Sequence, residues 1–302
     1  LGQLRMIPHI TICICTYRRP ELLRRLLAAL QTLESDGRFS HSVVVADNDA
    51  ERSAHKVAAA QHTQGMLEIV YVSEPRQNIA LARNAALRHS TGDYVAFIDD
   101  DEFPGPRWLL DMLDTCVRTG SSGVLGPVRP HFDSPPPDWI VRGRFCERPE
   151  FSTGREMPGN ECRTGNVLFR RDILATLGDQ PFREQFGTGG EDVDFFVRLT
   201  GSGCTFRWCQ EGAVYETVPP ERWTRRYMIR RALLRGRNTL KVPGSHFVRL
   251  AKSLVAVPLY GVLLPLTLPL GQHIFMRYCI RFCDHAGRLL AAIGLNPVDA
   301  RA

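Results

Sequence analysis

Residues 94–104 read YVAFIDDDEFP, an apolar run that ends abruptly in acids. The apolar part, 94–98, predicts a buried strand, and four acids, Asp99 to Glu102, follow it at once. Adjacent carboxylates repel each other unless a cation lies between them, and Mg²⁺ and Mn²⁺ bind carboxylates together with substrate phosphates. The stretch therefore predicts either a metal–diphosphate site at the end of a strand or a solvated acidic loop at a helix start, where acids are also favoured.

Strand-like and helix-like segments alternate along the chain on both sides of this stretch. Apolar β-branched runs predict strands at 9–16, 42–46, 67–72, 94–98, 123–128, 166–170, 205–209 and 213–215. Helical spacing of apolar residues predicts helices at 20–33, 50–64, 79–89, 106–117, 191–199 and 221–240, with a long loop or flap at 130–160. Such alternation is typical of an α/β fold with a mostly parallel sheet and helices on both faces.

Polar residues gather where three of the expected strands end. These positions are Thr16 to Arg19, Asp47 to Asp49, and Asp99 to Asp101. In open parallel sheets, ligands bind at the carboxyl ends of the strands. The sequence contains neither a GxGxxG nor a GxxxxGK[ST] phosphate loop. A nucleotide bound here would need a metal ion to neutralise its phosphates, which favours the metal interpretation of the acidic run.

The order and spacing of several short motifs resemble those of family 2 glycosyltransferases, which have the GT-A fold, a Rossmann-like arrangement, and use nucleotide-diphosphate sugars. The motifs are TYRRP at 16–20, DN at 47–48, NIALARNAAL at 78–87, GD at 92–93, DDD at 99–101 and GGED at 189–192. The longer run FIDDDEFPGPRW at 97–108 resembles the ExoM-like branch, bacterial glucosyltransferases that build exopolysaccharide on a lipid carrier. The resemblance covers roughly residues 9–240.

The resemblance implies roles for individual residues of this sequence. The nucleotide would be contacted by Thr16, Arg18, Asp47, Asp99 and Asp100. Within that set, Asp47 would accept a hydrogen bond from a uracil ring and Asp100 would contact the ribose. Asp101, together with Asp99, would hold Mg²⁺ or Mn²⁺ on the diphosphate. Glu216 stands near a position where related enzymes often carry a metal-binding histidine.

The resemblance also implies that Asp192 is the catalytic base, with Glu191 beside it as a second catalytic candidate. Glycosyl transfer needs a base for the attacking hydroxyl, and one carboxylate suffices for a single displacement with inversion. The start of a helix favours an ionised acid at this position. Without the resemblance, an acid pair in a first helical turn is the more common explanation.

The C-terminal quarter differs in charge from the rest of the chain. From Arg222 to Cys283 there are 12 basic and no acidic residues, so the remainder holds 38 − 12 = 26 bases against 32 acids. Residues 253–271 lack charge over 19 positions, but prolines interrupt them and bases flank both ends. We expect a catalytic domain at 1–220 and a basic and apolar helical extension at 221–302. That extension would re-enter or lie in an anionic membrane surface without crossing it, or else pack as a buried helix.

These features predict an inverting, metal-dependent hexosyltransferase. It would move a sugar, with glucose from UDP-glucose as the first candidate, to a lipid-linked saccharide acceptor at the cytoplasmic face of a bacterial inner membrane. Two alternatives stay open at this point: a nucleotidyltransferase acting on sugar phosphates, and a non-catalytic protein that binds anionic lipid or nucleic acid through the basic quarter. The glycosyltransferase interpretation has no nucleic-acid partner. The lack of a Gly-rich, Lys-containing loop after the first strand counts against the nucleotidyltransferase, and the non-catalytic alternative leaves the acidic run and Glu191-Asp192 unexplained. The nine cysteines include no CxxC pair and predict reduced thiols rather than a disulfide framework.

Overall fold

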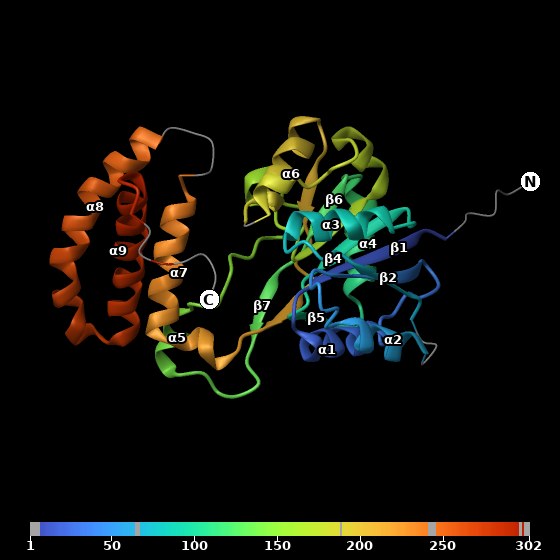
Figure 1. Cartoon of the computed structure of the whole chain (residues 1–302), viewed down its shortest axis with the longest axis horizontal. Helices are drawn as coiled ribbons and strands as arrows, with labels where there is room; N and C mark the ends of the chain where they lie inside the picture. The colour runs from blue at the N-terminus through green and yellow to red at the C-terminus, as the bar shows by residue number, and fades with distance from the viewer. Residues whose placement is uncertain (1–6, 64–66, 188, 241–245, 296–297, 299–302) are drawn as a thin grey trace, which may run out of the picture. The chain divides into compact units, whose positions relative to one another are not determined.

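The computed structural model describes residues 7–63, 67–187, 189–240, 246–295 and 298 (Figure 1). The chain forms two compact units. The first, here called the sheet unit, comprises Leu1–Pro130 and Arg148–Thr217. The second, the helical unit, comprises His131–Glu147 and Val218–Ala302. Each unit is thus built from two separate stretches of sequence.

The sheet unit is organised around seven strands in the order β3-β2-β1-β4-β8-β6-β9. Their bounds are β1 His9–Thr16, β2 Ser40–Asp47, β3 Ile69–Ser73, β4 Tyr94–Ile98, β6 Gly123–Leu125, β8 Asn166–Arg170 and β9 Phe206–Trp208. The first four in this order are parallel, and β6 is parallel to β9, whereas β8 is antiparallel to both β4 and β6. The predicted mostly parallel α/β sheet is confirmed, with one antiparallel strand inside it.

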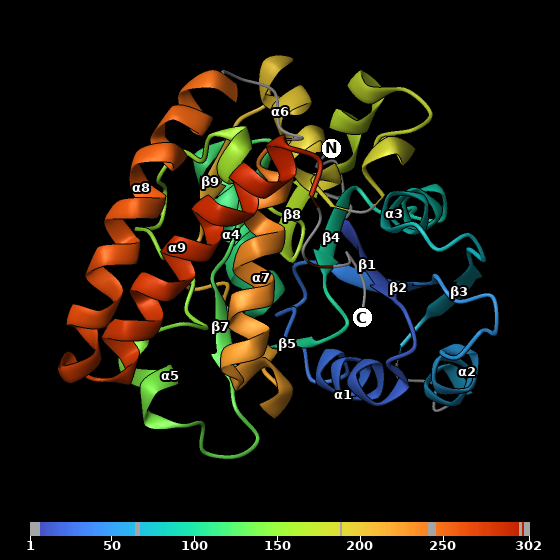
Figure 2. The same ribbon diagram turned by 60° about the vertical axis from the view of Figure 1, so that its left-hand side comes forward.

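Helices cover both faces of this sheet, as the sequence predicts (Figure 2). Their bounds are α1 Pro20–Leu30, α2 His55–Thr63, α3 Ile79–Arg88, α4 Trp108–Thr119 and α6 Glu191–Gly201. One core joins α1, α2 and α4 to the face that carries Ile10, Ile12 and Ile14. The other core joins α3 and α6 to the face that carries Cys13. Successive residues of a strand point to opposite faces, so a strand buried on both faces, such as β1, supplies both cores.

A second, three-stranded sheet in the order β5-β10-β7 adjoins the end of β4. Its strands are β5 Glu102–Pro104, β7 Val128–His131 and β10 Val214–Thr217. In the antiparallel β5–β10 pair, Glu216 lies opposite Glu102. The sequence predicted one strand at 123–128, but the structure ends β6 at Leu125 and begins β7 at Val128. Gly126 and Pro127 lie at the break: Pro127 cannot donate to a strand ladder, and a Cβ at Gly126 would lie 2.1 Å from the Gly212 carbonyl oxygen.

The second helix also begins later than predicted, at His55 and not at residue 50. Residues just before it form turns, and Arg52 has a left-handed backbone with φ +56°. Asp47 fixes the end of this segment, since its Oδ2 accepts the Ala54 amide at 2.8 Å. A side chain at the end of β2 therefore determines where α2 begins.

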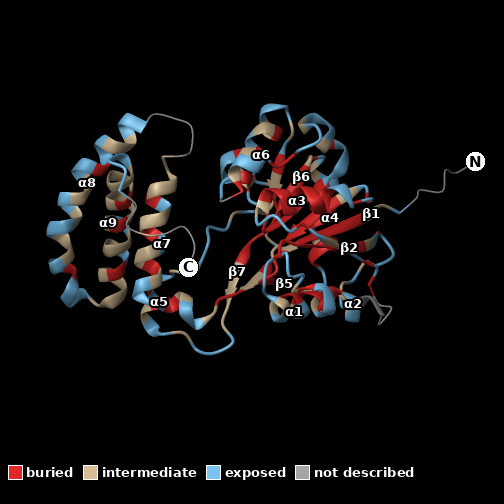
Figure 3. Ribbon diagram, viewed as in Figure 1, coloured by how far each residue is buried: buried red, intermediate tan, exposed pale blue. Residues whose placement is uncertain are grey.

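The helical unit contains α5 Asp138–Gly143, α7 Arg225–Asn238, α8 His246–Thr267 and α9 Gln272–Ala292. Short 3₁₀ turns occur in the chain at Gly159–Glu161, Arg171–Leu177, Glu184–Phe186, Pro220–Trp223 and Leu268–Leu270. In both ribbon views α9 lies beside α7 and α8. The core of this unit includes Ile140, Trp223 and Met276, so the segment expected to be a loop at 130–160 contributes a short helix whose Ile140 is buried. Most of α8 is not buried (Figure 3).

Candidate active site

The strand order of the larger sheet reverses between β1 and β4, which is where ligands bind in open α/β sheets. The two strands are paired in parallel, with Cys13 opposite Phe97. Three residues further along β1, Thr16 donates its hydroxyl to Asp100 Oδ2 at 2.8 Å. The structure thus brings together two residues predicted to contact a nucleotide, although 84 positions separate them in sequence.

Arg18 and Arg19 leave the end of β1 in different directions. Arg18 has φ +55°, and its guanidinium pairs with Asp49 at 3.2 Å and with Glu51 at 3.1 Å. Arg19 instead reaches Asp100 Oδ1 at 3.1 Å and Asp101 Oδ2 at 3.3 Å. No role was predicted for Arg19, yet it neutralises two of the three aspartates after β4. The adjacent arginines of the TYRRP motif were the available sequence signal.

Asp47 ends β2 directly opposite Thr16 of β1. Its carboxylate is fully buried and accepts hydrogen bonds from the Ala54 amide at 2.8 Å, the Tyr71 hydroxyl at 2.9 Å and the Asp49 amide at 3.2 Å. These three donors make Asp47 the anchor of the loop between β2 and α2. Its contact with a uracil ring stays a prediction.

Four carboxylates gather beyond the end of β4, here called the acidic cluster: Asp99, Asp101, Glu102 and Glu216. Glu102 lies opposite Glu216 in the small sheet, and the Thr217 amide donates to the Asp101 carbonyl at 2.7 Å. Burial, followed by the nearby Asp99 charge, raises the pKa of Glu102 well above its usual value. Arg148 pairs with Glu216 at 2.5 Å and supplies one positive charge to this group.

The acidic cluster has the donor chemistry that a divalent cation requires. Glu102 Oε1 is buried and has no hydrogen-bond partner among the described residues. Gly165 leaves room beside it, because a Cβ there would lie 2.9 Å from Glu102 Oε1 and 3.2 Å from Asp99 Oδ2. Within the described ranges, no three His, Cys, Asp or Glu side chains are arranged as ready-made metal ligands. An unpartnered buried oxygen among neighbouring acids nevertheless suits Mg²⁺ or Mn²⁺, which prefer oxygen ligands.

Arg83 of α3 links the strand end to the start of α6. Its guanidinium forms an ion pair with Glu191 and lies 3.9 Å from Asp99 Oδ1. The side chains of Arg83 and Glu191 are only 8% and 7% exposed. Burial lowers the pKa of Arg83, but the Glu191 and Asp99 carboxylates raise it by more, so the guanidinium stays charged. Glu191, predicted as a second catalytic residue, is therefore placed in a buried ion pair.

The NIALARN motif of α3 holds the segment that leads into α6. Asn78 caps α3 and donates to the Glu184 carbonyl at 3.0 Å. Asn84 donates to the Phe182 carbonyl at 2.7 Å and accepts the Phe182 amide at 2.9 Å. These amide contacts, together with the Arg83–Glu191 pair, join α3 to residues 182–191. The sequence revealed the motif but not this function, because the partners lie about 100 positions away.

Asp192 occupies the first turn of α6, after Gly189 and Gly190, whose φ angles are +126° and +96°. Positive φ angles favour glycine and turn the chain sharply here. The Asp192 side chain is 19% exposed, and its Oδ2 lies 3.7 Å from Arg163 Nε. Its neighbour Glu191 is buried against Arg83, whereas Asp192 keeps access to solvent. The two acids of the GGED motif thus have different environments.

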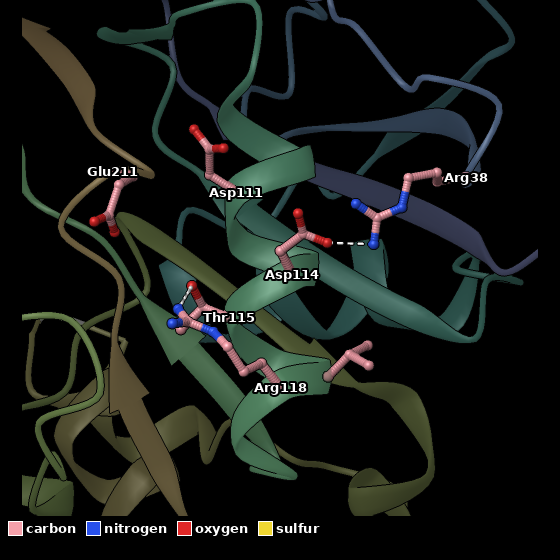
Figure 4. Close-up of a pocket in the computed structure, with 7 residues that line it drawn as sticks. Arg38, Asp111, Asp114, Thr115, Arg118 and Glu211 are labelled. Carbon is pink, nitrogen blue, oxygen red and sulfur yellow. Dashed lines mark hydrogen bonds and ion pairs between the residues drawn. The ribbon is translucent and has the colours of Figure 1, made fainter.

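A hollow on α4 contains none of these residues (Figure 4). It is lined by Arg38, Asp111, Asp114, Thr115, Val117, Arg118 and Glu211. Arg38 pairs with Asp114, and Arg118 donates to the Thr115 hydroxyl at 3.4 Å. Arg38 precedes β2 and so lies near the amino ends of the strands, away from the predicted ligand site. The other two acids have partners outside the hollow, since Asp111 pairs with Arg107 and Glu211 accepts from the Thr153 hydroxyl.

Replacing Asp100 with Asn is expected to change how stability depends on pH. Burial raises the pKa of Asp100 to about 6, although Arg19 and the Thr16 hydroxyl act against it. The folded chain then binds more protons than the unfolded chain between about pH 4 and about pH 6, so stability is lost as pH rises. Relative to Asp100→Asn, the unsubstituted chain should lose roughly 3 kcal/mol of its free energy of unfolding across this range. Urea unfolding of both proteins in EDTA measures the free energy of unfolding at each pH. A difference between the two proteins that does not change with pH would contradict the expectation.

Comparison with known proteins identifies the family. The model of glycosyl transferase family 2 matches residues 11–178. The chain belongs to this family. As a family 2 glycosyltransferase it is an enzyme of the predicted class, which decides against the nucleotidyltransferase and the non-catalytic binding protein.

A similar sequence is that of succinoglycan biosynthesis protein ExoM from Rhizobium meliloti (strain 1021). This chain is 36% identical to it over 301 residues, which cover 96% of this chain and 95% of that protein. The predicted resemblance to the ExoM-like branch is confirmed.

Solved structures share the fold. Mannosyltransferase PcManGT from Pyrobaculum calidifontis, in complex with GDP-Man and Mn²⁺, has a TM-score of 0.58 and 18% identity, covering 98% of this chain and 78% of that chain. TarS 1-349 from S. aureus, in complex with UDP-GlcNAc, has a TM-score of 0.54 and 14% identity, covering 97% of this chain and 95% of that chain. The family 2 chain therefore has the GT-A fold.

Proposed function

We propose that this family 2 glycosyltransferase moves glucose from UDP-glucose to a lipid-linked saccharide acceptor, with inversion, in the synthesis of a bacterial exopolysaccharide or cell-surface glycan. Similarity along nearly the whole chain to a succinoglycan biosynthesis protein supports the exopolysaccharide setting. One observation carries the proposal. Side-chain contacts connect the start of α6 with the place between β1 and β4 where the strand order reverses. Thr16 contacts Asp100 there, and Arg83 lies between Asp99 and Glu191.

The donor nucleotide is proposed to bind along the ends of β1, β2 and β4. Thr16 and Asp100 form the inner edge of this site, where Asp100 would contact the ribose, and Arg18 lies at its outer edge beside Asp49. Asp47 lies at the end of β2, where the uracil ring is expected. The TarS 1-349 structure with UDP-GlcNAc has the same fold, which supports a nucleotide-sugar donor for this chain.

Asp101 and Asp99 are proposed to hold Mg²⁺ or Mn²⁺, with Glu216 nearby. A divalent cation stabilises the negative charge that develops on a departing diphosphate. The unpartnered Oε1 of Glu102 and the space beside Gly165 support a cation in the acidic cluster. Mn²⁺ in the PcManGT structure, which shares the fold, supports the same proposal.

Asp192 is proposed as the base that accepts the proton of the attacking acceptor hydroxyl. Its carboxylate is partly exposed, so an acceptor can reach it, whereas Glu191 is buried in an ion pair. Glu191 is proposed to act indirectly, because its pairing with Arg83 fixes the first turn of α6 and hence the position of Asp192.

The helical unit is proposed to associate with the anionic cytoplasmic face of the inner membrane. Helix His246–Leu270 is long and apolar enough to cross a membrane, and little of it is buried. Prolines 258 and 265 lie inside α8, and the basic helix α7 belongs to the same unit. A helix with exposed apolar residues next to a basic helix is typical of a protein that lies in the membrane surface.

A donor screen tests the catalytic proposal. UDP- and GDP-linked glucose, galactose, mannose and rhamnose are each supplied with Mg²⁺, with Mn²⁺ or with EDTA, and hydrolysis and transfer are measured. We expect turnover with UDP-glucose in the presence of either cation and its loss in EDTA, because the diphosphate charge is then not neutralised. Asp101→Asn should need a higher cation concentration for half-maximal rate. Full turnover in EDTA, or turnover with a GDP-sugar only, would contradict the proposal.

A further inference from the structure

Arg148 places a positive charge at the acidic cluster, the group of carboxylates proposed to hold the divalent cation. Its Nη2 lies 2.5 Å from Glu216 Oε2, and this is its only ion pair among the described residues. Glu216 in turn lies opposite Glu102 in the β5–β10 pair. Like charges repel, so a cation that approaches these carboxylates is opposed by the guanidinium already there. Arg148 and the cation therefore compete for the same group of acids.

Arg148 also interacts electrostatically with acids that it does not pair with. Burial lowers the pKa of Arg148, but the Glu216 and Glu102 carboxylates, followed by Asp99, raise it by more, so the guanidinium stays charged. In the reverse direction, burial raises the pKa of Glu102 and that of Asp99, and Arg148 is among the charges that counteract both shifts. The charge of Arg148 thus acts on three of the four carboxylates of the acidic cluster.

One buried oxygen of the acidic cluster has no partner although Arg148 is present. Glu102 is 1% exposed, and its Oε1 accepts no hydrogen bond from the described residues. A Cβ at Gly165 would lie 2.9 Å from this oxygen and 3.2 Å from Asp99 Oδ2, so both oxygens face the same small space. Arg148 supplies charge to this place but no hydrogen bond to Glu102 Oε1. A divalent cation would supply both charge and coordination.

Arg148 can leave its position more readily than the two other arginines that approach these acids. The Arg148 side chain is 41% exposed and is paired with one carboxylate. Arg19 and Arg83 each approach two carboxylates, and Arg83 is only 8% exposed. A partly exposed ion pair contributes little stability, because water solvates the separated charges. Exchange of Arg148 for another cation therefore costs little.

The donor diphosphate offers Arg148 a new partner. The diphosphate is proposed to bind at the acidic cluster, and arginine forms charge-assisted hydrogen bonds with phosphate oxygens. A cation that binds alone leaves the displaced guanidinium in water beside it. A cation that binds together with a diphosphate leaves the guanidinium next to new negative charge. Binding of the cation should therefore depend on binding of the donor.

We propose that Arg148 is a built-in counter-cation of the acidic cluster, and that it moves to the donor diphosphate when the divalent cation and the donor bind together. This role rests on the proposed cation site and adds regulation to it, since the chain holds the cation weakly until a nucleoside diphosphate is present. Coupling between two ligands is reciprocal, so the cation should tighten UDP binding by the same factor as UDP tightens cation binding.

Binding of Mn²⁺ to the full chain tests this role without any turnover. Free Mn²⁺ is measured by electron paramagnetic resonance, first without nucleotide and then with saturating UDP. Without nucleotide, Arg148→Gln should bind Mn²⁺ about tenfold more tightly than the unsubstituted chain, because a repelling charge is removed. The factor by which UDP tightens Mn²⁺ binding should fall by about tenfold or more. Arg148→Ala should have the same effects and serves as a second neutral variant if Arg148→Gln fails to fold.

Arg155→Gln is the matched control. Arg155 lies in the segment that follows Arg148, is 38% exposed and pairs with Glu161 instead of the acidic cluster. Its loss removes the same charge, and the affinity for Mn²⁺ should stay within about twofold of that of the unsubstituted chain. Arg148→Lys keeps the charge at the cluster, so it should keep both the weak binding of Mn²⁺ and the strong effect of UDP.

The possible results separate this role from the proposed function. Weaker binding of Mn²⁺ in Arg148→Gln would overturn the role, because Arg148 would then only hold Glu216 in place. Affinities equal to those of the unsubstituted chain, with and without UDP, would overturn it as well. If no variant binds Mn²⁺ even with UDP, the proposed cation site fails and the role of Arg148 fails with it. If Mn²⁺ binds as expected but UDP-glucose is not turned over, only the proposed donor fails.

Discussion

Asp192→Asn is expected to lower the rate of sugar transfer by about 100-fold to 10,000-fold, the range that a positioned general base contributes. The amide has nearly the same shape as the carboxylate but cannot accept the proton of the attacking hydroxyl. Because the Asp192 side chain is partly exposed and lies at the start of α6, the substitution should leave folding unchanged. Single-turnover transfer with UDP-glucose measures the rate. An unchanged dissociation constant for UDP shows that the donor site still folds.

Asp194→Asn provides a matched control on the same helical turn. Its carboxylate pairs with Arg183 at 3.2 Å and with Arg198 Nε at 2.8 Å, away from the proposed base. It removes the same charge from the start of α6, so it also reports any general effect of that charge. Its transfer rate should stay within about threefold of the unsubstituted enzyme. Equal losses in the two variants, or undiminished transfer in Asp192→Asn, would remove Asp192 from the mechanism.

Arg83→Met is expected to lower the free energy of unfolding by about 3–5 kcal/mol, because it leaves the buried Glu191 carboxylate without its counter-charge. Both side chains of this pair are more than nine-tenths buried, so water cannot replace the lost partner. Since Glu191 begins α6, the loss should also displace Asp192 and slow sugar transfer. Urea unfolding of the purified chain measures the first effect.

The companion variants separate charge from packing. Arg88→Met removes an exposed arginine from the last turn of the same helix and should change stability by less than about 0.5 kcal/mol. Arg83→Met combined with Glu191→Gln removes both charges and should recover part of the lost stability, since no buried charge is left unpaired. If Arg83→Met costs no more than Arg88→Met, the pair does not contribute to stability as described.

Local sequence patterns predicted the sheet unit well for a physical reason. The strands 9–16, 94–98 and 166–170 have the predicted bounds because short runs rich in β-branched and aromatic residues favour strands. The split between β6 and β7 was missed although Gly126 and Pro127 interrupt the run, and Pro cannot donate to a strand ladder. What the sequence could not show is the approach of the distant Gly212 carbonyl to Gly126. The same holds for α2, whose start depends on a hydrogen bond from Ala54 to Asp47.

The candidate site was likewise predictable where local motifs determine it and not where contacts between distant residues do. Motif order placed Thr16 and the aspartates after β4 at one edge of the sheet, and the Thr16–Asp100 hydrogen bond confirms that these two residues are neighbours. Arg19, Arg83 and Glu102 were given no definite role, because their roles depend on which charges lie beside them after folding. An arginine in a helix has the same local pattern whether it is solvated or buried against an acid from α6.

The discontinuity of the helical unit has a consequence for synthesis on the ribosome. Residues 131–147 emerge well before residues 218–292, yet Ile140 is buried with Trp223 and Met276. Until the later residues are made, Ile140 lacks the partners Trp223 and Met276, and the apolar side chains of this early segment resemble the exposed surfaces on which chaperones act. The sheet unit, by contrast, has all its strands once Thr217 has emerged. The nascent chain is therefore most vulnerable to aggregation in the interval between these two events.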